Sequence, residues 1–515
     1  MLRLVLFVTL SLWTQAAATK AEPPFRVRPY LQYPTQDAMT ICWFSTSSEP
    51  GTVTIETPNG LRKLASAPEK AETLGYNPFG EEPDGPHPQP PYKHRVRVTG
   101  LESGTAYRYT VRQGDAESAS MLHTAPDRDT SVRFILYADS ETEPESTNVA
   151  VDWPLAEGSN RPEGITKYLV DQTTGYRENL KVIDSRKPDF ICVVGDLVEA
   201  GGEQRDWEEF WKHNAGEYNS LASHIPLVAA LGNHENFGGP GSFGGYSAKA
   251  ADYGCAKFLT YFEFPSNGAD DPHHVGRYYR IDYGPVTLIT VDSSDGLPAN
   301  TTDDTNHNLF GSHAPDFNRG SAQYAWLEVQ LADAQHKSRF TFVQYHHTAY
   351  GSGPHSVPFG HKNFSGQSGI AMRVLQPLFM KYGVDAVISG HDEMLERSLV
   401  PGQETLADGT EIPHEIHYYD VGNGGDGLRS AAQGFDNPYR KFLAHDDAPE
   451  VWDGRQLKSG GKHYGHLEVN VAPDPSGRWQ VTMDMAQVFP LTDEAGEVVG
   501  WERRTYDDHV TLNQR

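Results

Sequence analysis

The stretch VDAVISGHDE, residues 384–393, shows the arrangement that decides the fold of this chain. Its first six residues form a largely apolar run of the length of one β-strand, and Gly390 and His391 follow where that strand should end. An imidazole and a carboxylate at such a position, here His391 and Glu393, are side chains that bind metals. The sequence therefore predicts a buried strand with two metal ligands at its carboxyl end.

Four other segments repeat this design. They are YADSE (137–141) with Asp139 and Glu141, VVGDLV (193–198) with Asp196, ALGNHE (230–235) with Asn233 and His234, and QYHHTAY (344–350) with His346 and His347. Sites in α/β sheets form outside the carboxyl ends of the strands, so the five segments are expected to meet at one crevice. Each segment alone has a plainer explanation, because Gly-Asp after a strand is usually a turn and a lone histidine is usually structural. Five in succession are difficult to explain in that way.

The elements around these segments predict an α/β domain at residues 131–491. Apolar strand-like runs such as RFILYAD and DFICVVGD alternate with helical stretches such as DWEEFWKHN. Strand-like runs return after Glu411 and are expected to complete a sheet of the same domain. The polar residues 492–515 are expected to form a loosely held tail.

Residues 25–126 predict a small all-β domain. Segments such as AMTICWFS (38–45) and KHRVRVTG (93–100) have the pattern of half-buried antiparallel strands. The string LESGTAYRYTV (101–111) is typical of a fibronectin type III-like sandwich. This domain contains no convergent set of ligand residues, so we expect it to be a scaffold.

The first 18 residues, MLRLVLFVTLSLWTQAAA, predict a secretory signal peptide that is cleaved near Ala18. The mature chain is therefore expected to be exported to the periplasm or the cell exterior. No later run approaches 18 apolar residues, so no membrane span is expected. Three cysteines are too few for a disulfide scaffold, and Cys42 and Cys192 lie in apolar runs that are typical of a protein core.

The formal net charge of −26 disfavours binding to nucleic acid or to an anionic membrane. It would also repel a phosphorylated substrate at long range. Any phosphate site must therefore supply positive charge locally, and metal ions are one way to do so.

The order of the five segments resembles that of the calcineurin-like metallophosphoesterases, and RPYLQ (28–32) with the sandwich that follows is similar to the purple acid phosphatases. The resemblance implies an α/β sandwich, with a two-layered β-sheet core flanked by helices, that holds two metal ions close together. It also implies hydrolysis of a small phosphorylated substrate. In that reaction the metals lower the pKa of a bound water, and the resulting hydroxide attacks phosphorus in line.

The same resemblance assigns roles to the ligand positions. One metal would be held by Asp196, Asn233, His346 and His391, and the other by Asp196, Asp139, Glu141 and Glu393. Asp196 would bridge the two ions. His234 would assist the leaving group instead of binding metal, and His347 and Arg429 are candidates to contact the substrate. Arg429 ends the glycine-rich string VGNGGDGLR (421–429), which resembles a late loop of the family.

Three positions depart from the family pattern. Glu199 stands where the purple members carry a tyrosine, so no purple colour is expected. Glu141 and Glu393 stand where related enzymes carry histidines, and both fall on the same metal. That metal would have only oxygen ligands, which suit a hard ion such as Mn²⁺, Fe³⁺, Mg²⁺ or Ca²⁺. The histidine-containing site suits Zn²⁺, Fe²⁺ or Mn²⁺. The pattern indicates a remodelled site, because each replacement is itself a competent ligand.

Two long segments, residues 300–318 and 351–366, are expected to cover the crevice. They carry His307, His313, His355 and His361, for each of which a surface role is favoured.

The motifs leave three functions open. Hydrolysis of phosphomonoesters is favoured, and hydrolysis of phosphodiesters by the same fold is the first alternative. The other alternative is a non-catalytic, metal-stabilised binding or adhesion protein in which the sandwich is the working module. A structural metal site has no need of His234 in addition to its ligands, which disfavours this last interpretation.

Overall fold

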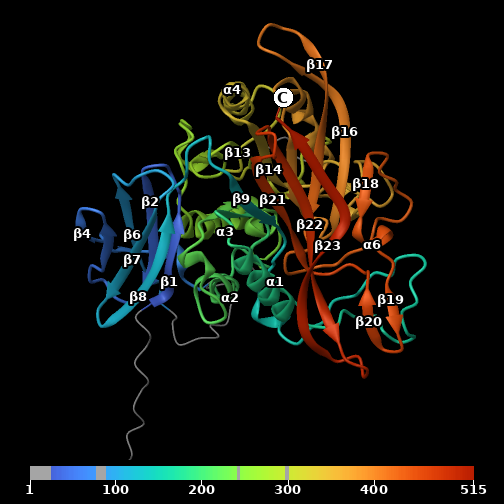
Figure 1. Ribbon diagram of the computed structural model, residues 1–515, viewed down its shortest axis with the longest axis horizontal. Helices are drawn as coiled ribbons and strands as arrows, with labels where there is room; N and C mark the ends of the chain where they lie inside the picture. Colours follow the sequence, from blue (N-terminus) through green and yellow to red (C-terminus); the bar gives the residue numbers. More distant parts are fainter. Residues whose placement is uncertain (1–24, 77–88, 240–243, 296–300, 515) are drawn as a thin grey trace, which may run out of the picture.

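The computed structural model describes residues 25–76, 89–239, 244–295 and 301–514, so the expected signal peptide lies outside the described residues. The predicted all-β sandwich is confirmed (Figure 1). Its two antiparallel sheets have the strand orders β1-β2-β6-β5 and β4-β3-β7-β8. The strands are β1 (Phe25–Gln32), β2 (Ala38–Ser45), β3 (Thr52–Thr57), β4 (Gly60–Ala65), β5 (Glu69–Lys70), β6 (Tyr92–Thr99), β7 (Ala106–Gln113) and β8 (Ala116–His123).

Alternating side chains of the two sheets fill the core of the sandwich. Tyr107, Tyr109 and Val111 of β7 point inward, as do Val53 and Ile55 of β3, while the residues between them are more exposed. This period of two is the pattern that the sequence shows, because successive side chains of a strand lie on opposite faces.

The second domain is the predicted α/β sandwich, built on two large sheets. One has the order β11-β10-β9-β21-β22-β23 and the other β12-β13-β14-β15-β17-β16-β18. The strands of the first sheet are β9 (Val132–Tyr137), β10 (Phe190–Val194), β11 (Leu227–Ala230), β21 (Gly465–Pro473), β22 (Trp479–Thr492) and β23 (Val498–Asn513). Those of the second are β12 (Tyr279–Tyr283), β13 (Val286–Thr290), β14 (Phe340–His347), β15 (Ala386–Gly390), β16 (Leu395–Thr405), β17 (Glu411–Val421) and β18 (Arg440–Leu443). A separate ribbon joins β19 (Val451–Asp453) and β20 (Gln456–Ser459).

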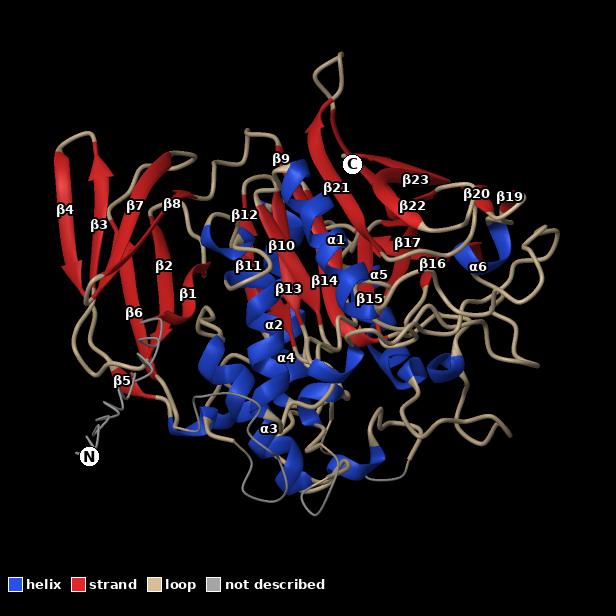
Figure 2. Ribbon diagram, turned by 90° about the horizontal axis from the view of Figure 1, so that it is seen from below, coloured by secondary structure: helices blue, strands red, loops and turns tan. Residues whose placement is uncertain are grey.

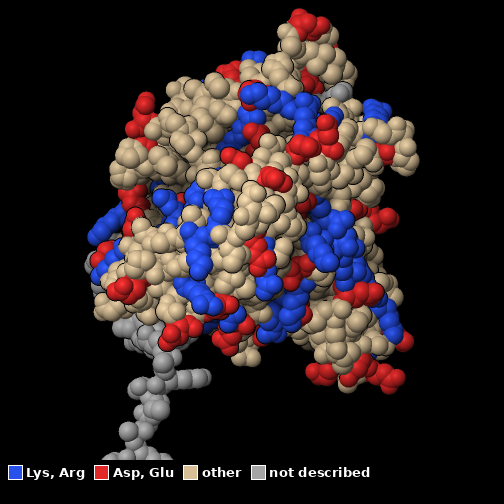
Figure 3. Space-filling view, turned by 60° about the vertical axis from the view of Figure 1, so that its left-hand side comes forward, with Lys and Arg blue, Asp and Glu red and all other residues tan. Residues whose placement is uncertain are grey.

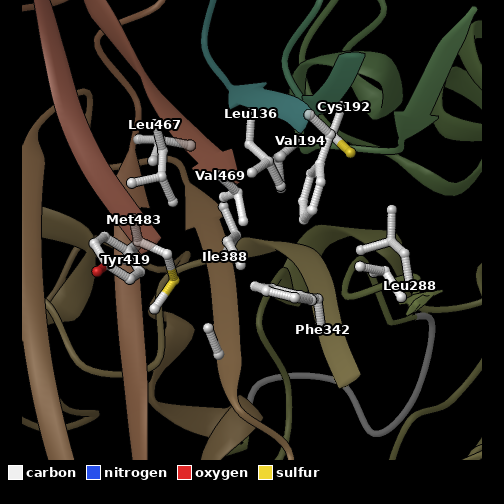
Figure 4. Close-up of a cluster of buried hydrophobic side chains, with 14 of the residues drawn as sticks. Leu136, Cys192, Val194, Leu288, Phe342, Ile388, Tyr419, Leu467, Val469 and Met483 are labelled. Atoms are coloured by element: carbon white, nitrogen blue, oxygen red, sulfur yellow. The ribbon is translucent and has the colours of Figure 1, made fainter. Parts of the chain in front are cut away.

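The main hydrophobic core lies between these two sheets (Figure 4). Leu136, Val194 and Val469 reach it from the first sheet, and Phe342 and Ile388 reach it from the second. The strands that carry them are buried on both faces, so their sequences read as continuous apolar runs.

Helices cover the outer faces of both sheets (Figure 2). The first sheet is covered by α1 (Gln172–Arg186), α2 (Gln204–Ala215) and α3 (Ala248–Tyr261), and the second by α4 (Ala322–Lys337) and α5 (Gln376–Lys381). The Asp171 side chain caps the start of helix α1 by accepting a hydrogen bond from the Thr174 amide. A short helix, α6 (Ala444–Asp447), follows β18. Single 3₁₀ segments are η1 (Glu72–Leu74), η2 (Pro144–Ser146), η3 (Leu221–Ser223), η4 (His234–Asn236), η5 (Pro272–His274), η6 (His307–Leu309), η7 (Pro354–Ser356) and η8 (Gly369–Leu375).

The sandwich and the α/β domain share a buried junction. The ring of Tyr30 lies 4.4 Å from that of Trp211 on α2, and the ring of Phe44 lies 5.0 Å from that of Tyr261 on α3. The Tyr30 hydroxyl also donates to the Tyr261 carbonyl at 2.5 Å. Aromatic contacts of this kind bury large apolar area, so the two domains are joined by more than the linker between them.

The expectation of a loosely held tail at residues 492–515 is wrong. Residues Val498–Asn513 form β23, which pairs with β22 along most of its length. The side chains of Tyr506 and Val510 are buried in the main core. The segment is polar because the other side chains of this edge strand face solvent, and charged residues on an edge strand discourage pairing with other chains.

No helix among the described residues is long and apolar enough to cross a membrane. Cys42 and Cys192 are buried and unpaired, as the sequence predicts. On the face shown in Figure 3, which carries the sandwich, basic and acidic side chains are interspersed. The negative charge of the chain is therefore not gathered into one patch on that face.

Candidate metal centre

The five predicted ligand segments follow or end the strands β9, β10, β11, β14 and β15. Strands β9, β10 and β11 run parallel, as do β14 and β15, so the carboxyl ends within each set lie at a common edge. The segments meet there. Three groups of side chains place their ligand atoms within 4.8 Å of one another: Asp196 with His346 and His391, Glu141 with Asp196 and His234, and Glu141 with Glu393 and Asp426.

The first group is built around His346. Its Nε2 lies 2.8 Å from Asp196 Oδ2 and 3.0 Å from Asn233 Oδ1, while its Nδ1 lies 2.9 Å from the Val194 carbonyl. Burial by itself lowers the pKa of His346, but the carboxylates of Asp196 and Asp139 outweigh it and the pKa rises to about 9. A buried position that stabilises a positively charged imidazole also favours a cation, so this donor set fits a metal ion.

The glycine of the Gly-Asp motif makes this packing possible. Gly195 has a φ of +88°, and a Cβ added there would lie 2.4 Å from His346 Nδ1. Any other residue would be strained in its backbone and would displace the imidazole. The motif is therefore more than a turn: the glycine admits one candidate ligand and the following aspartate supplies another.

The pKa values of two aspartates at the centre are shifted in opposite directions. Burial raises the pKa of Asp139 to about 7, and both oxygens of its carboxylate lie within 3.0 Å of the backbone nitrogen of His391. Burial also acts to raise the pKa of Asp196, but the positive charges of His346 and His234 outweigh it and the pKa falls to about 2. Asp196 is thus the carboxylate that stays ionised in this crevice.

Five candidate ligands have left-handed backbone conformations. They are Asp139, Glu141, Asp196, His391 and Glu393, with φ between 34° and 77°. Such values are uncommon outside glycine and cost about 1–3 kcal/mol each, so they persist only where the surroundings impose them. Their concentration at one crevice marks it as a functional site.

Glu235 holds the loops of this crevice together through hydrogen bonds to their backbone. It was not among the predicted site residues. Its buried carboxylate accepts hydrogen bonds from the amides of Asp196 at 3.0 Å, Leu197 at 2.8 Å and Gly232 at 2.6 Å. These bonds tie the loop after β10 to the loop after β11. The sequence did offer one signal for this role, because Glu235 is the last residue of ALGNHE and lies shortly after a strand. A glutamate that is buried in such a position needs hydrogen-bond partners.

His234 lies beside the candidate ligands. Its backbone amide donates to Asp196 Oδ1 at 2.8 Å, its Nδ1 lies 2.6 Å from the Glu199 carbonyl, and its Nε2 lies 3.8 Å from Glu141 Oε1. Burial lowers the pKa of His234, but Tyr246, Asp196 and Glu199 outweigh it and raise the pKa well above its usual range. The Glu199 carbonyl accepts a hydrogen bond from Nδ1–H, so Nε2 is the ring nitrogen that faces Glu141 in the crevice.

Three further histidine rings pack together beside the centre. The ring of His391 lies 4.5 Å from that of His347 and 4.1 Å from that of His355. His347 is fully buried, with Nδ1 2.8 Å from Ser293 Oγ, so it supports His391 and does not face the crevice mouth. His355 lies at the mouth, where its Nε2 is 3.1 Å from Arg429 Nη1. The expectation of a bland surface role is therefore wrong for His355.

The two long segments contact each other through aromatic rings. His307 packs against Phe359 and Phe364, with ring centroids 5.7 Å and 5.4 Å apart. His313 forms an ion pair with Asp252, 2.8 Å away, and stacks on His273, so it lies outside the centre.

Glu393, the other glutamate that stands at a histidine position, has two basic neighbours. Its carboxylate forms an ion pair with Arg429, and its backbone carbonyl accepts from the buried ammonium of Lys462. Burial lowers the pKa of Lys462 to about 7. Burial and, next, the charge of Asp426 raise the pKa values of Glu141 and Glu393 well above their usual range. These carboxylates are therefore short of positive charge, which a cation would supply.

Comparison with known proteins agrees with this architecture. Residues 169–392 match the calcineurin-like phosphoesterase family, and residues 24–125 match the purple acid phosphatase N-terminal domain. An uncharacterized protein of Mycobacterium tuberculosis is 27% identical over 59% of this chain and 50% of its own length. Probable inactive purple acid phosphatase 27 of Arabidopsis thaliana is 24% identical over 54% of this chain and 43% of its own length. The chain thus spans about half the length of the curated relatives it matches.

The structure of the purple acid phosphatase PPD1 from yellow lupin seeds superimposes with a TM-score of 0.61. It covers 94% of this chain and 74% of its own chain at 19% sequence identity, a likeness that concerns the fold. Both family matches and this superposition agree with the order of motifs along the sequence. The chain therefore combines a domain of the calcineurin-like phosphoesterase family, at residues 169–392, with a purple acid phosphatase N-terminal domain, at residues 24–125.

Proposed function

We propose that this chain is an exported hydrolase of phosphoric esters that uses two metal ions, with phosphomonoesters as its preferred substrates. One observation carries the proposal: the Asp196 carboxylate belongs to two adjoining groups of ligand atoms, one with His346 and His391 and the other with Glu141 and His234. A carboxylate shared in this way is suited to bridge two cations. Export rests on the predicted signal peptide at residues 1–18.

We assign the ligands to two unlike sites. Asp196, Asn233, His346 and His391 would hold Zn²⁺, Fe²⁺ or Mn²⁺, because imidazole suits these ions. Asp196, Asp139, Glu141 and Glu393 would hold Mn²⁺, Fe³⁺, Mg²⁺ or Ca²⁺, because carboxylates suit hard cations. The two ions would supply activation of a water molecule and neutralisation of the phosphoryl oxygens.

The surrounding side chains would orient the ester and move its proton. His234 receives the role of general acid, since its Nδ1 is occupied by the Glu199 carbonyl and its Nε2 faces the crevice. Arg429 and His355, which contact each other at the mouth, are suited to bind the non-reacting phosphate oxygens. Arg429 would then exchange its ion pair with Glu393 for the substrate.

A second candidate is a non-catalytic binding protein with the same fold. Arabidopsis relatives named as probable inactive purple acid phosphatases favour it, as do the two histidine positions occupied by Glu141 and Glu393. The raised pKa of His234 and its place beside Asp196 favour catalysis, because a purely structural metal site needs no proton donor at its edge.

The test is a paired assay on the purified protein before and after chelation. We expect hydrolysis of para-nitrophenyl phosphate to exceed that of its bis-ester, to stop when metals are removed, and to return when they are added back. Elemental analysis of the same samples should give two metals per chain. Faster hydrolysis of the bis-ester would support the phosphodiesterase alternative, and full metal content without hydrolysis of either ester would support the binding protein.

The unlike sites predict a change of metal preference in the double variant Glu141→His, Glu393→His. It restores nitrogen ligands to the carboxylate site, so we expect Zn²⁺ to replace the harder ion there while metal binding persists. Metal content after growth in mixed metals would measure this. Two zinc ions in the unmodified protein would contradict the assignment. Glu415→His, on the exposed part of β17, is a matched control that should leave the metal content unchanged.

A further inference from the structure

Asp426 lies in the loop that follows β17, and no family motif gives it a role. Its carboxylate places an oxygen within 4.8 Å of ligand atoms of Glu141 and Glu393, and these three residues form a group without histidine. Asp426 does not join the groups around Asp196. The Glu141 carboxylate therefore lies between two positions, one beside Asp196 and His234 and the other beside Glu393 and Asp426.

The side chain of Asp426 is largely buried, with 9% of the residue exposed. Across the described part of the chain, no protein group forms a hydrogen bond or an ion pair with its carboxylate. A largely buried carboxylate without a protein donor is unfavourable unless water or a cation solvates it. Glu141 and Glu393 lie beside it, so three carboxyl groups meet here. Arg429 forms an ion pair with Glu393, and His234 lies 3.8 Å from Glu141, but among the described residues neither cation is paired with Asp426.

The backbone holds this arrangement in place. The amides of Gly425 and Asp426 both donate to the Asp139 carbonyl, at 3.1 Å and 2.8 Å, so the loop is bonded to the end of β9. The next residue, Gly427, has a φ of +82°, and a Cβ there would lie 2.3 Å from Glu393 Oε2. The loop is thus shaped to bring Asp426 and Glu393 together, which repulsion between their charges would otherwise oppose.

We propose that Asp426 is a ligand, together with Glu141 and Glu393, of the hard divalent cation in the carboxylate site. Three carboxylates and no nitrogen are a donor set for Mg²⁺, Ca²⁺ or Mn²⁺. Glu141, Glu393 and Asp426 would hold the cation with their carboxylate oxygens, and it would supply the positive charge that the Asp426 carboxylate lacks. The inference rests on one part of the proposed function, namely that the carboxylate site holds a metal ion.

The experiment is a Mn²⁺ titration of the metal-free protein in the presence of one equivalent of Zn²⁺, followed by electron paramagnetic resonance. Asp426→Asn keeps the size of the side chain and removes its charge, so we expect it to weaken Mn²⁺ binding at least tenfold while zinc is retained. Asp426→Ala should weaken it equally. Asp436→Asn, an exposed acid in the same stretch after β17, is the control and should bind Mn²⁺ as the parent does.

A second measurement separates a ligand from a structural residue. Without metal, removal of one charge from a crowded acidic group should leave the thermal midpoint of Asp426→Asn equal to that of the parent or above it. With Mn²⁺, the variant should gain less stability than the parent. Parent-like Mn²⁺ binding by the variant, or a lower midpoint without metal, would overturn the proposal. Failure of the unmodified protein to bind any metal would instead overturn the proposed function.

Discussion

The variant Asp196→Asn should lose about 10³-fold or more in turnover of phosphomonoesters, equivalent to several kcal/mol of transition-state stabilisation. The carboxylate accepts from the His234 amide through Oδ1, at 2.8 Å, and lies 2.8 Å from His346 Nε2 through Oδ2. An asparagine keeps one side-chain oxygen, but it removes the negative charge that stabilises protonated His234 and His346. It also places an NH2 group against one of these two contacts. We also expect the metal content to fall, because the bridging position no longer neutralises two cations.

The measurement is kcat for para-nitrophenyl phosphate together with elemental analysis of the same preparation. Asp115→Asn is the matched control, since it makes the same change at an exposed position of the sandwich, far from the crevice. It should keep activity and metal content. Near-normal turnover with two metals in Asp196→Asn would remove Asp196 from its central role and with it the proposed arrangement of the sites.

The variant His234→Ala should keep both metals and lose roughly 10²–10⁴-fold in turnover, the usual contribution of a positioned general acid. The loss should depend on the leaving group. An alkyl phosphate, whose leaving oxygen needs a proton, should show the full effect, whereas para-nitrophenyl phosphate should show a smaller one. The Nε2 of His234 faces the crevice while its Nδ1 contacts the Glu199 carbonyl, so the proton available for this step is the one on Nε2.

A series of aryl phosphates of increasing leaving-group pKa would measure the dependence. His336→Ala removes an exposed histidine of α4 and should leave the whole series unchanged. An equal loss for every leaving group would exclude the general acid and would indicate that His234 acts only in binding.

Local patterns predicted most of the fold. The apolar runs at β10, β14 and β15 are buried on both faces, so their sequence alone indicates strands, and the glycines and polar residues after them mark where each strand ends. The period of two in β7 predicted the sandwich. The same patterns failed at β23, because an edge strand with most of its residues in solvent has too few apolar positions to be distinguished from a tail.

What the sequence by itself determined was the identity of the candidate ligands, since Asp139, Asp196 and His391 each follow a strand that local hydrophobicity defines. What only the tertiary structure decided was which side chains from distant segments meet them. His355 approaches His391 from a long loop, Glu235 bonds the amide of Asp196, and Asp426 reaches Glu141 and Glu393 from the loop after β17. These residues carry no local pattern of their own. Their roles depend on the packing of two sheets and on the burial of charge, which are long-range properties, whereas strand periodicity is a property of neighbouring residues.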